Sequence, residues 1–428
     1  MKHKKILAAS LIIASAICSN ITAYGAVNDI TKQDNPKEIN DLQSNTVEEE
    51  IAVYPDDYSI AMFSQWVADS GQYNEYYYDQ LPEIEKYIYD CINTNIDSII
   101  GCDNPFIVDV SDFNVLYSQI KSGDLNWSRP IFTYFDFDHC EKFGVNYFNL
   151  GLSISGIPIN NGEDYKVTQL GIYFGGSNAA SSILEYSNAK EINDDKKILD
   201  NNVNKIISSI PKYASRYKKA QIINDWLVKN NTYNPYVYNG NNDAASKRAW
   251  DITSALVYTD NTSDDTKYPV CEGYSNAFKY LCDKAGIPCV SVESSTHKWN
   301  LIKLEDGNWY HIDVTWNDPV GATNYSYINK YFLLGSSNSL IKNSDHTINM
   351  TNPTLTSPVA STKDYSYKNA HNGDVNQDYL IDYTDVALML KHISGKSKIT
   401  NIGSSDINND NVIDFKDVIQ VLNLIKAQ

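Results

Sequence analysis

Two acidic segments near the C-terminal end of the chain share one pattern of oxygen-bearing side chains. The first runs from Asp374 to Asp385 and the second from Asp406 to Asp417. In both, Asp or Asn stands at positions 1, 3, 5, 9 and 12. Calcium prefers about six to eight oxygen ligands, and a loop of about 12 residues with this spacing wraps them around one ion. Two such loops in register predict a small calcium-binding module.

The ligands expected in each loop are the side chains at those five positions and the backbone carbonyl at position 7. They are Asp374, Asn376, Asp378, Leu380, Asp382 and Asp385 in the first loop, and Asp406, Asn408, Asp410, Val412, Asp414 and Asp417 in the second. Each loop runs into an amphipathic segment that predicts a helix. Position 6 favours a residue that tolerates positive φ, as Asn411 does. Tyr379 is strained there, so we expect the first loop to bind calcium more weakly.

The segment from about Gly373 to Lys426 resembles a type I dockerin, the module by which enzymes of fibre-degrading complexes bind cohesins on a scaffoldin. The resemblance implies a small all-α module with two structural calcium ions and a cohesin domain as its partner. It also implies that loop positions 10 and 11 help to recognise the cohesin. These residues are Tyr383, Thr384, Phe415 and Lys416. They differ between the two repeats, which argues against a symmetric, reversible binding mode.

Upstream of this module, Cys271 is expected at the N-terminus of a helix. Tyr268-Pro269-Val270 should be extended, because proline disfavours a helical conformation in the residue before it. Residues 271–285 then have a helical pattern, which Gly286 ends. A helix N-terminus favours the thiolate, which is the reactive form of cysteine. The alternative is a structural role, since cysteine is among the residue types most often buried.

A predicted β-hairpin follows this helix. Its strands are residues 297–304 and 309–315, joined by a turn that contains Gly307. If the turn is a three-residue loop with a left-handed Gly307, His297 and Asp313 lie on the same face of the sheet. A two-residue turn would place them on opposite faces. The sequence allows both registers, and only the first brings His297 and Asp313 together.

Three short motifs in this region resemble those of the transglutaminase-like superfamily. They are Cys271-Glu-Gly-Tyr-Ser, His297-Lys-Trp-Asn and Asp313-Val-Thr-Trp-Asn-Asp-Pro, within a likeness that covers about Val203 to Leu334. The resemblance implies an α+β, papain-like core in which the cysteine helix packs on an antiparallel sheet. It further implies that Cys271 is the nucleophile, His297 the general base and acid, and Asp313 the residue that orients the imidazole.

Such a Cys–His pair attacks an amide or ester carbonyl and forms a thioester, with no catalytic cofactor. If water resolves the thioester, the protein is a cysteine peptidase or amidase, which is the interpretation we favour. If an amine resolves it, the protein is a cross-linking transglutaminase. A third hypothesis is a catalytically silent binding module in a polysaccharide-degrading complex. A glycosidase is disfavoured because no pair of catalytic carboxylates stands out.

The rest of the chain divides by composition. A basic start, an apolar stretch and small residues near Gly25 predict a signal peptide. The polar residues after it predict a disordered tether. A mixed pattern then predicts an α/β accessory region with a helix at 81–92 and strands at 130–137, 145–157 and 168–174. The predicted division is signal peptide 1–25, tether 26–50, N-terminal accessory region 51–200, catalytic core 201–345, linker 346–371 and dockerin 372–428.

The net charge and the hydropathy limit which classes of partner and which location we expect for the protein. The net charge of −18 disfavours a nucleic-acid partner. No segment after the signal peptide is long and apolar enough to span a membrane. We therefore expect a secreted protein of a cellulosome or cell-surface complex, with a protein or peptide substrate. Loss of Cys18 with the signal peptide leaves six of the seven cysteines, an even number that permits disulfides. Whether Cys91, Cys102 and Cys140 form disulfides stays open.

Overall fold

The structure is a computed structural model of the 428-residue chain. It describes residues 75–99, 105–122, 130–144, 151–173, 186, 189–211, 214–234, 237, 248–259, 268–304, 306–320, 328–349, 355–366, 373–376, 378, 380–399, 402–408 and 410–427. The predicted signal peptide and tether, Cys102 and Tyr379 lie outside the described residues. Among the helices it describes, none is both long enough and apolar enough to cross a membrane.

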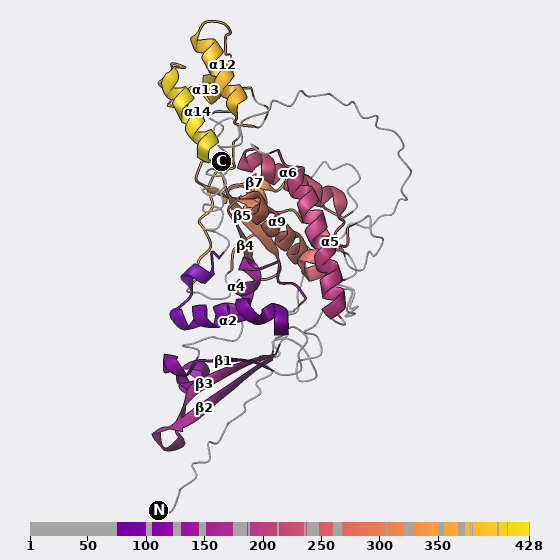
Figure 1. The fold of residues 1–428 in the computed structure, drawn as a ribbon, viewed down its shortest axis with the longest axis vertical. Coiled ribbons are helices and arrows are strands. Elements are labelled where there is room, and N and C mark those ends of the chain that lie inside the picture. Colours follow the sequence, from indigo (N-terminus) through magenta and orange to yellow (C-terminus); the bar gives the residue numbers. More distant parts are fainter. Residues whose placement is uncertain are drawn as a thin grey trace, which may run out of the picture.

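The N-terminal region combines short helices with a three-stranded antiparallel sheet in the order β1-β3-β2 (Figure 1). Its apolar core combines aromatic side chains, mainly from helices α2 and α4, with aliphatic side chains from β1 and β3. The elements are η2 (Tyr78–Gln80), α2 (Glu83–Ile99), β1 (Phe106–Asp109), η3 (Ser111–Phe113), α3 (Tyr117–Ser122), α4 (Pro130–Asp138), β2 (Gly151–Ile159), η5 (Asn160–Gly162) and β3 (Asp164–Tyr173).

One secondary-structure prediction in this region is wrong. Residues 130–137 were expected to form a strand, but they form helix α4. Almost every side chain of α4 is buried, so its sequence lacks the polar face that marks a surface helix. A short apolar run of this kind cannot be assigned from periodicity alone. The helix at 81–92 is confirmed by α2. The described parts of the strands at 168–174 and 145–157 lie in β3 and β2.

The central region packs helices on a four-stranded antiparallel sheet in the order β4-β5-β6-β7. Helix α9 lies between this sheet and helices α5, α6 and α8, and the buried apolar residues of all these elements form one cluster. The expected packing of the cysteine helix on an antiparallel sheet is therefore observed. The elements are α5 (Ala189–Ser208), α6 (Arg216–Asn230), η7 (Arg248–Trp250), α8 (Ile252–Leu256), α9 (Cys271–Ala285), β4 (Cys289–Glu293), β5 (Lys298–Lys303), β6 (Trp309–Ile312), β7 (Phe332–Leu334) and α10 (Ser339–Lys342).

The β5–β6 hairpin has the register that brings the predicted residues together. Lys303 pairs with Trp309, and Asn300 pairs with Ile312. Gly307 has a φ of 78°, the left-handed conformation expected for the three-residue loop. The pairing continues toward Asp313, which directly follows β6.

Residues 355–366 fall within the predicted linker, yet they contact the folded regions. The amide of Ser361 donates to the carbonyl of Trp309 at 2.8 Å, and the amide of Tyr365 donates to Leu333 at 3.0 Å. Thr356 donates its amide to the side chain of Gln80 at 2.9 Å. The segment thus runs along the central sheet and reaches the N-terminal region, so flexible-linker composition does not describe its conformation.

The C-terminal module lies at the opposite end of the molecule from the N-terminal sheet (Figure 1). It consists of α12 (Tyr383–Ile393), α13 (Ile402–Ser405) and α14 (Phe415–Ala427). Met389 from α12 and Val421 and Ile425 from α14 are almost fully buried between the helices. The module therefore has an apolar core of its own.

Candidate active site and calcium loops

Cys271 is the first residue of α9, as expected, and it follows an extended Val270. Its side chain is 5% exposed. The start of α9 is held close to the segment before α8, because a Cβ on Gly273 would lie 2.7 Å from the carbonyl oxygen of Ala249. This close approach requires glycine at that position and fixes where the helix N-terminus, and with it the thiol, is located.

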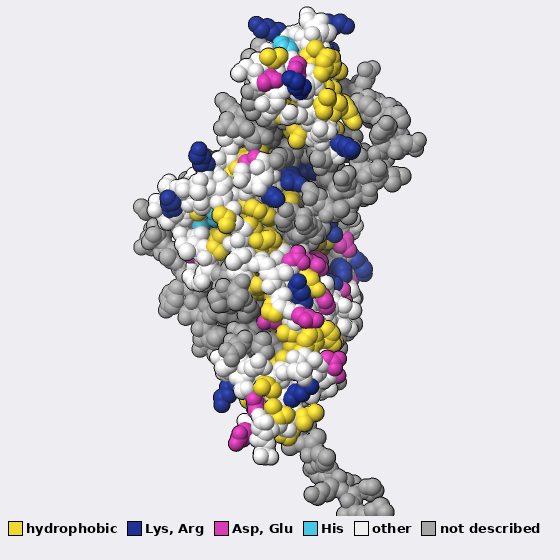
Figure 2. Space-filling model, turned by 90° about the vertical axis from the view of Figure 1, so that its left-hand side faces the viewer, with side chains coloured by type: hydrophobic (Ala, Val, Ile, Leu, Met, Phe, Trp, Pro, Cys, Tyr) yellow, Lys and Arg dark blue, Asp and Glu magenta, His cyan; other side chains and the backbone are white. Residues whose placement is uncertain are grey.

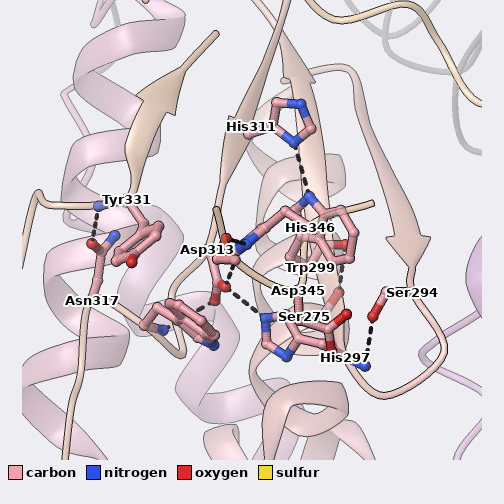
Figure 3. A network of polar contacts seen from close by, with 12 residues as sticks. Ser275, Ser294, His297, Trp299, His311, Asp313, Asn317, Tyr331, Asp345 and His346 are labelled. Atoms are coloured by element: carbon pink, nitrogen blue, oxygen red, sulfur yellow. Dashed lines mark hydrogen bonds and ion pairs between the residues drawn. The ribbon is translucent and has the colours of Figure 1, made fainter. Parts of the chain in front are cut away.

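His297 and Asp313 are in direct contact. His297 Nε2 lies 2.6 Å from Asp313 Oδ2 (Figure 3). The turn before β5 holds the backbone of His297, whose amide donates to Ser294 Oγ at 3.1 Å. The other carboxylate oxygen of Asp313 accepts the backbone N–H of Trp316 at 3.1 Å. Both side chains are therefore buried and held from two directions.

The charges of this pair follow from its environment. Burial by itself lowers the pKa of His297, but the negative charge and hydrogen bond of Asp313, together with a hydrogen bond to Cys271, raise that pKa to about 10. Burial would raise the pKa of Asp313, but the charge of His297 and hydrogen bonds from His297 and His346 hold it well below its usual range. The resting pair is an imidazolium next to a carboxylate. Because Nε2 faces Asp313, Nδ1 is the nitrogen available to the thiol.

Trp299 packs beside this pair. Its ring stacks on His297 with centroids 5.7 Å apart, and it stacks on His311 on the other side at 6.2 Å. The indole Nε1–H donates to His311 Nδ1 at 3.0 Å. Burial, and the neighbouring His346, lower the pKa of His311 to about 4, so it is a neutral acceptor at neutral pH. Trp299 therefore confines the His297 ring while its own polar group is satisfied.

A second histidine, which the sequence analysis missed, also contacts the aspartate. His346 Nε2 lies 2.9 Å from Asp313 Oδ2, the same oxygen that His297 contacts (Figure 3). His346 follows α10 and falls at the start of the predicted linker. A lone histidine in a polar stretch shows no periodicity, and no motif in the sequence marks it.

The residue types of His297, Asp313 and His346 are also those of common metal ligands. One ligand atom from each lies within 4.8 Å of the other two. Two imidazoles and a carboxylate suit zinc. Here, however, both Nε2 atoms are within hydrogen-bonding distance of Asp313 Oδ2, so a cation would have to displace a proton from each ring. Hydrogen bonding accounts for the arrangement without a metal.

A buried ion network connects this site to the N-terminal region. Lys298 Nζ lies 2.8 Å from Asp136 Oδ2 of α4 and 3.2 Å from Glu272 Oε1. Glu272 follows Cys271 in the chain and Lys298 follows His297. The network thus ties together the two segments that carry the thiol and the imidazole, and α4 supplies its third member. Burial raises the pKa of Glu272 to about 8, although Lys298 acts in the opposite direction.

In both predicted calcium loops, the aspartate at position 12 accepts equivalent backbone amides. In the first, Asp385 accepts the amides of Val375 at 2.7 Å and Asp382 at 2.8 Å. In the second, Asp417 accepts the equivalent amides of Ile407 and Asp414, both at 2.9 Å. The aspartate at position 12 therefore holds each loop in its curved form.

The carboxylates of the loops fit a bound cation. Those at positions 1 and 12 are buried in both loops: Asp374, Asp385, Asp406 and Asp417. Burial, assisted by the charge of Asp374, raises the pKa of Asp385 to about 7 although three backbone N–H groups oppose the shift. Buried acidic groups crowded in this way are stabilised by a cation that shares their oxygens. Asn411, at position 6 of the second loop, has a φ of 65° as expected.

The four residues expected to contact a partner are exposed. Tyr383 and Phe415 are 48% and 61% exposed, and Thr384 and Lys416 are exposed as well. Lys416 lies over the second loop, with Nζ 3.5 Å from Asp410 and 3.6 Å from Asp414. Hydrophobic side chains gather on one side of the C-terminal module in Figure 2. This surface suits protein recognition, in which exposed aromatic residues are common anchors.

Comparisons with known proteins address the two parts of the chain separately. Residues 372–426 match the family described as "Dockerin type I domain". Kyphoscoliosis peptidase of Mus musculus is 25% identical over 150 residues, which cover 30% of this chain and 22% of the relative. Kyphoscoliosis peptidase of Homo sapiens is 23% identical with the same coverage. The chain thus matches about a fifth of the length of these curated relatives. Residues 372–426 of this chain form a dockerin type I domain.

Proposed function

We propose that this protein is a thiol enzyme of the transglutaminase-like class, in which Cys271 is the nucleophile, His297 the general base and acid, and Asp313 the residue that orients the imidazole. The observation that carries the proposal is the buried contact of 2.6 Å between His297 and Asp313 beside the thiol at the start of α9. Supporting it is the similarity of part of the chain to proteins whose name is peptidase.

The reaction follows from the arrangement of these groups. The proton shared by Cys271 and His297 is held on Nδ1 of the imidazolium, so the sulfur attacks a carbonyl carbon as the thiolate while the C=O electron pair moves to oxygen. The backbone N–H of Cys271, at the helix N-terminus, would stabilise that oxyanion. As the carbonyl re-forms, the C–N bond breaks and the imidazolium protonates the leaving amine. A thioester on Cys271 remains.

The fate of the thioester distinguishes two enzyme classes. Attack by water releases the acid and regenerates the thiol, which makes the protein a cysteine peptidase or amidase. Attack by a second amine forms a new amide, which makes it a cross-linking transglutaminase. We favour hydrolysis, because a dockerin delivers its enzyme to a degradative complex. A silent binding module is the remaining alternative.

The dockerin supplies the location of this activity. Dockerin domains bind calcium and bind cohesin domains of a scaffoldin, so we propose that the protein acts outside the cell on a cellulosome or cell-surface complex. We propose two calcium ions, one in each loop, held by the side chains at positions 1, 3, 5, 9 and 12 and by the carbonyls of Leu380 and Val412. Tyr383, Thr384, Phe415 and Lys416 would contact the cohesin.

The test compares hydrolysis and transamidation on the full-length protein. A labelled casein reports peptide release, and unlabelled casein with dansyl-cadaverine reports amine incorporation. We expect peptide release by the wild type and none by Cys271→Ala. Incorporation of the amine without release would identify a cross-linking enzyme.

A reactivity measurement complements this test when the substrate is a different protein. Chloroacetamide labelling of Cys271 is followed by mass spectrometry against pH, with His297→Ala as control. We expect fast labelling of Cys271 below the pH at which free cysteine reacts, about 8.5, and slow labelling in His297→Ala. Equal labelling of the two proteins would favour the silent module.

A further inference from the structure

His346 is placed to act on the aspartate of the proposed triad. Its side chain is fully buried, and its Nε2 shares the Oδ2 atom of Asp313 with Nε2 of His297, at 2.9 Å and 2.6 Å. The Oδ1 atom of Asp313 accepts the amide of Trp316. A single carboxylate oxygen thus receives two imidazole groups, and only one of them can also reach Cys271.

The proton positions on His346 follow from its partners. Asp313 is a carboxylate and can only accept, so Nε2 of each imidazole must carry a proton. On the other side of the ring, Nδ1 of His346 lies 2.5 Å from Ser344 Oγ, which lies 2.5 Å from the carbonyl oxygen of Leu340. The single hydroxyl proton of Ser344 goes to one of these two acceptors. In both cases the Nε2–H of His346 donates to Asp313.

Aromatic rings prevent His346 from turning away. The edges of Trp299 and Trp316 approach its ring at centroid distances of 4.8 Å and 5.1 Å. Tyr331 stacks on it at 5.6 Å with an interplanar angle of 10°. The ring is therefore fixed with one nitrogen on Asp313 and the other on Ser344.

We propose that His346 is a positioning residue that acts through Asp313: it takes part of the carboxylate's hydrogen-bonding capacity and so limits how tightly Asp313 holds the proton of His297. Without the second donor, the buried carboxylate would be compensated on Oδ2 by His297 alone, and that hydrogen bond would strengthen. An imidazolium that releases its proton less readily is a poorer acid toward the leaving amine. This inference rests on the proposed function of Cys271 and His297.

Other ionisable groups near His297 are few among the described residues. His311 lies behind Trp299, and Tyr331 lies behind His346. Asp345 contacts Thr296 through a hydrogen bond. The groups that face His297 or its direct partners are Cys271, His311, Asp313, Tyr331, Asp345 and His346.

The experiment compares His346→Leu with His346→Gln in the full-length protein. Leucine fills the cavity without a donor, whereas the amide nitrogen of glutamine can take the place of Nε2. We measure the rate of peptide release from labelled casein at neutral pH, because this reaction includes protonation of the leaving amine by His297. We also record the downfield proton NMR resonance of His297 Nε2–H, which moves further downfield as its hydrogen bond to Asp313 strengthens. His392→Leu, in the dockerin, controls for loss of a histidine elsewhere.

We expect His346→Leu to lower the rate of peptide release about tenfold, the low end of what hydrogen-bond partners behind metal ligands contribute, and to move the His297 resonance downfield. His346→Gln should recover most of the rate and the resonance position. The inference is overturned if His346→Leu matches the wild type. It is equally overturned if both variants lose the same rate while the His297 resonance stays in place, since that pattern indicates packing alone.

The two readouts keep the inference separate from the proposed function. If Cys271 of the wild type is no more reactive than in His297→Ala, the proposed enzyme is wrong. The NMR resonance still reports the contact of His297 with Asp313 in that case, and its response to His346→Leu and His346→Gln decides the inference by itself.

Discussion

In the dockerin, all expected calcium ligands belong to two short segments of the chain. The site in the central region instead combines the first residue of α9, the residue before β5, the residue after β6 and a histidine four residues beyond α10. The dockerin loops are curved by their own position-12 aspartates. The central site depends on strand register and on helix packing. A one-residue shift between β5 and β6 would separate His297 from Asp313 and leave both calcium loops intact.

The two sites differ in how readily a single sequence predicts them. Local spacing is enough when the ligands are within one loop. When residues come from separate elements, each additional contact needs a correct tertiary structure. The two sites should accordingly fail independently.

The largest effect is expected for Asp313→Asn. Asparagine keeps the shape but removes the charge that holds the His297 proton, and a comparable change in a serine protease triad lowers turnover about 10⁴-fold. We expect a loss of about 10³- to 10⁴-fold in the Cys271-dependent reaction. Calcium affinity, measured by titration calorimetry, should not change. Activity within tenfold of the wild type would show that Asp313 is not the orienting residue.

A smaller effect is expected for Asp136→Asn on α4. The change leaves the buried Lys298 with Glu272 as its remaining carboxylate in the network, and disrupting a buried ion pair costs about 3 kcal/mol of unfolding free energy. Denaturant unfolding measures this loss, and the labelling of Cys271 should slow with it. Asp194→Asn, on the exposed side of α5, is the matched control and should change neither quantity. Equal behaviour of the two variants would show that α4 does not support the site.

Part of the central site could be predicted from the sequence alone. The position of Cys271 at a helix start was predicted, because glycine and proline are local signals. The contact of His297 with Asp313 was expected only if the turn is a three-residue loop with a left-handed Gly307. The hairpin register was one of two alternatives, and the structure selects it.

The features that the sequence did not predict all depend on tertiary contacts. Helix α4 was predicted as a strand because burial on all sides removes its polar face. His346 and Asp136 each reach the site from distant parts of the chain, and their neighbours in sequence say nothing about that contact. The packing of residues 355–366 along the sheet was hidden in the same way, since several of its hydrogen bonds are made by the backbone.

Removing calcium tests whether the central site is independent of the dockerin. At a free calcium concentration about 100 times the dissociation constant, binding at one site stabilises the folded module by about 2.7 kcal/mol. With EGTA the buried carboxylates lose this compensation, so the dockerin should melt at a lower temperature and lose cohesin binding. The labelling rate of Cys271 should stay the same. A parallel loss of that rate would mean that the two sites are coupled.

The stability of the central region should fall as pH rises. Folded His297 keeps its proton up to a pKa of about 10, above the ordinary value of 6.5. Its contribution is therefore complete below pH 6.5 and is lost as pH rises through 10, by up to about 1.4 kcal/mol per pH unit. Asp313 acts oppositely, because its contribution is lost only in acid, as pH falls through its lowered pKa.

Glu272 also makes the stability of the central region fall with rising pH, but in a lower pH range. Its raised pKa of about 8 means that the folded protein binds the additional proton below that pH, so stability also falls as pH approaches 8. Between pH 8 and 9 the buried thiols of Cys140 and Cys282, whose pKa is raised by burial, also contribute to the fall in stability, so the contribution of His297 is the difference in the slope of the denaturant midpoints between the wild type and His297→Leu. His297→Leu should flatten the curve in this window, and Glu272→Gln should not. An unchanged slope in His297→Leu would contradict the ion pair.

The smallest effect concerns the difference between the two calcium loops. Asn411 has a φ of 65°, where a residue with Cβ and no polar side chain costs about 1 kcal/mol. Asn411→Ala should therefore weaken the second site by about fivefold, and Asn411→Gly should not. Tyr379 occupies the equivalent position of the first loop, so Tyr379→Gly should tighten that site by a similar factor. Calorimetric titration separates the two sites, and a first site that binds as tightly as the second before substitution would refute the asymmetry expected from Tyr379.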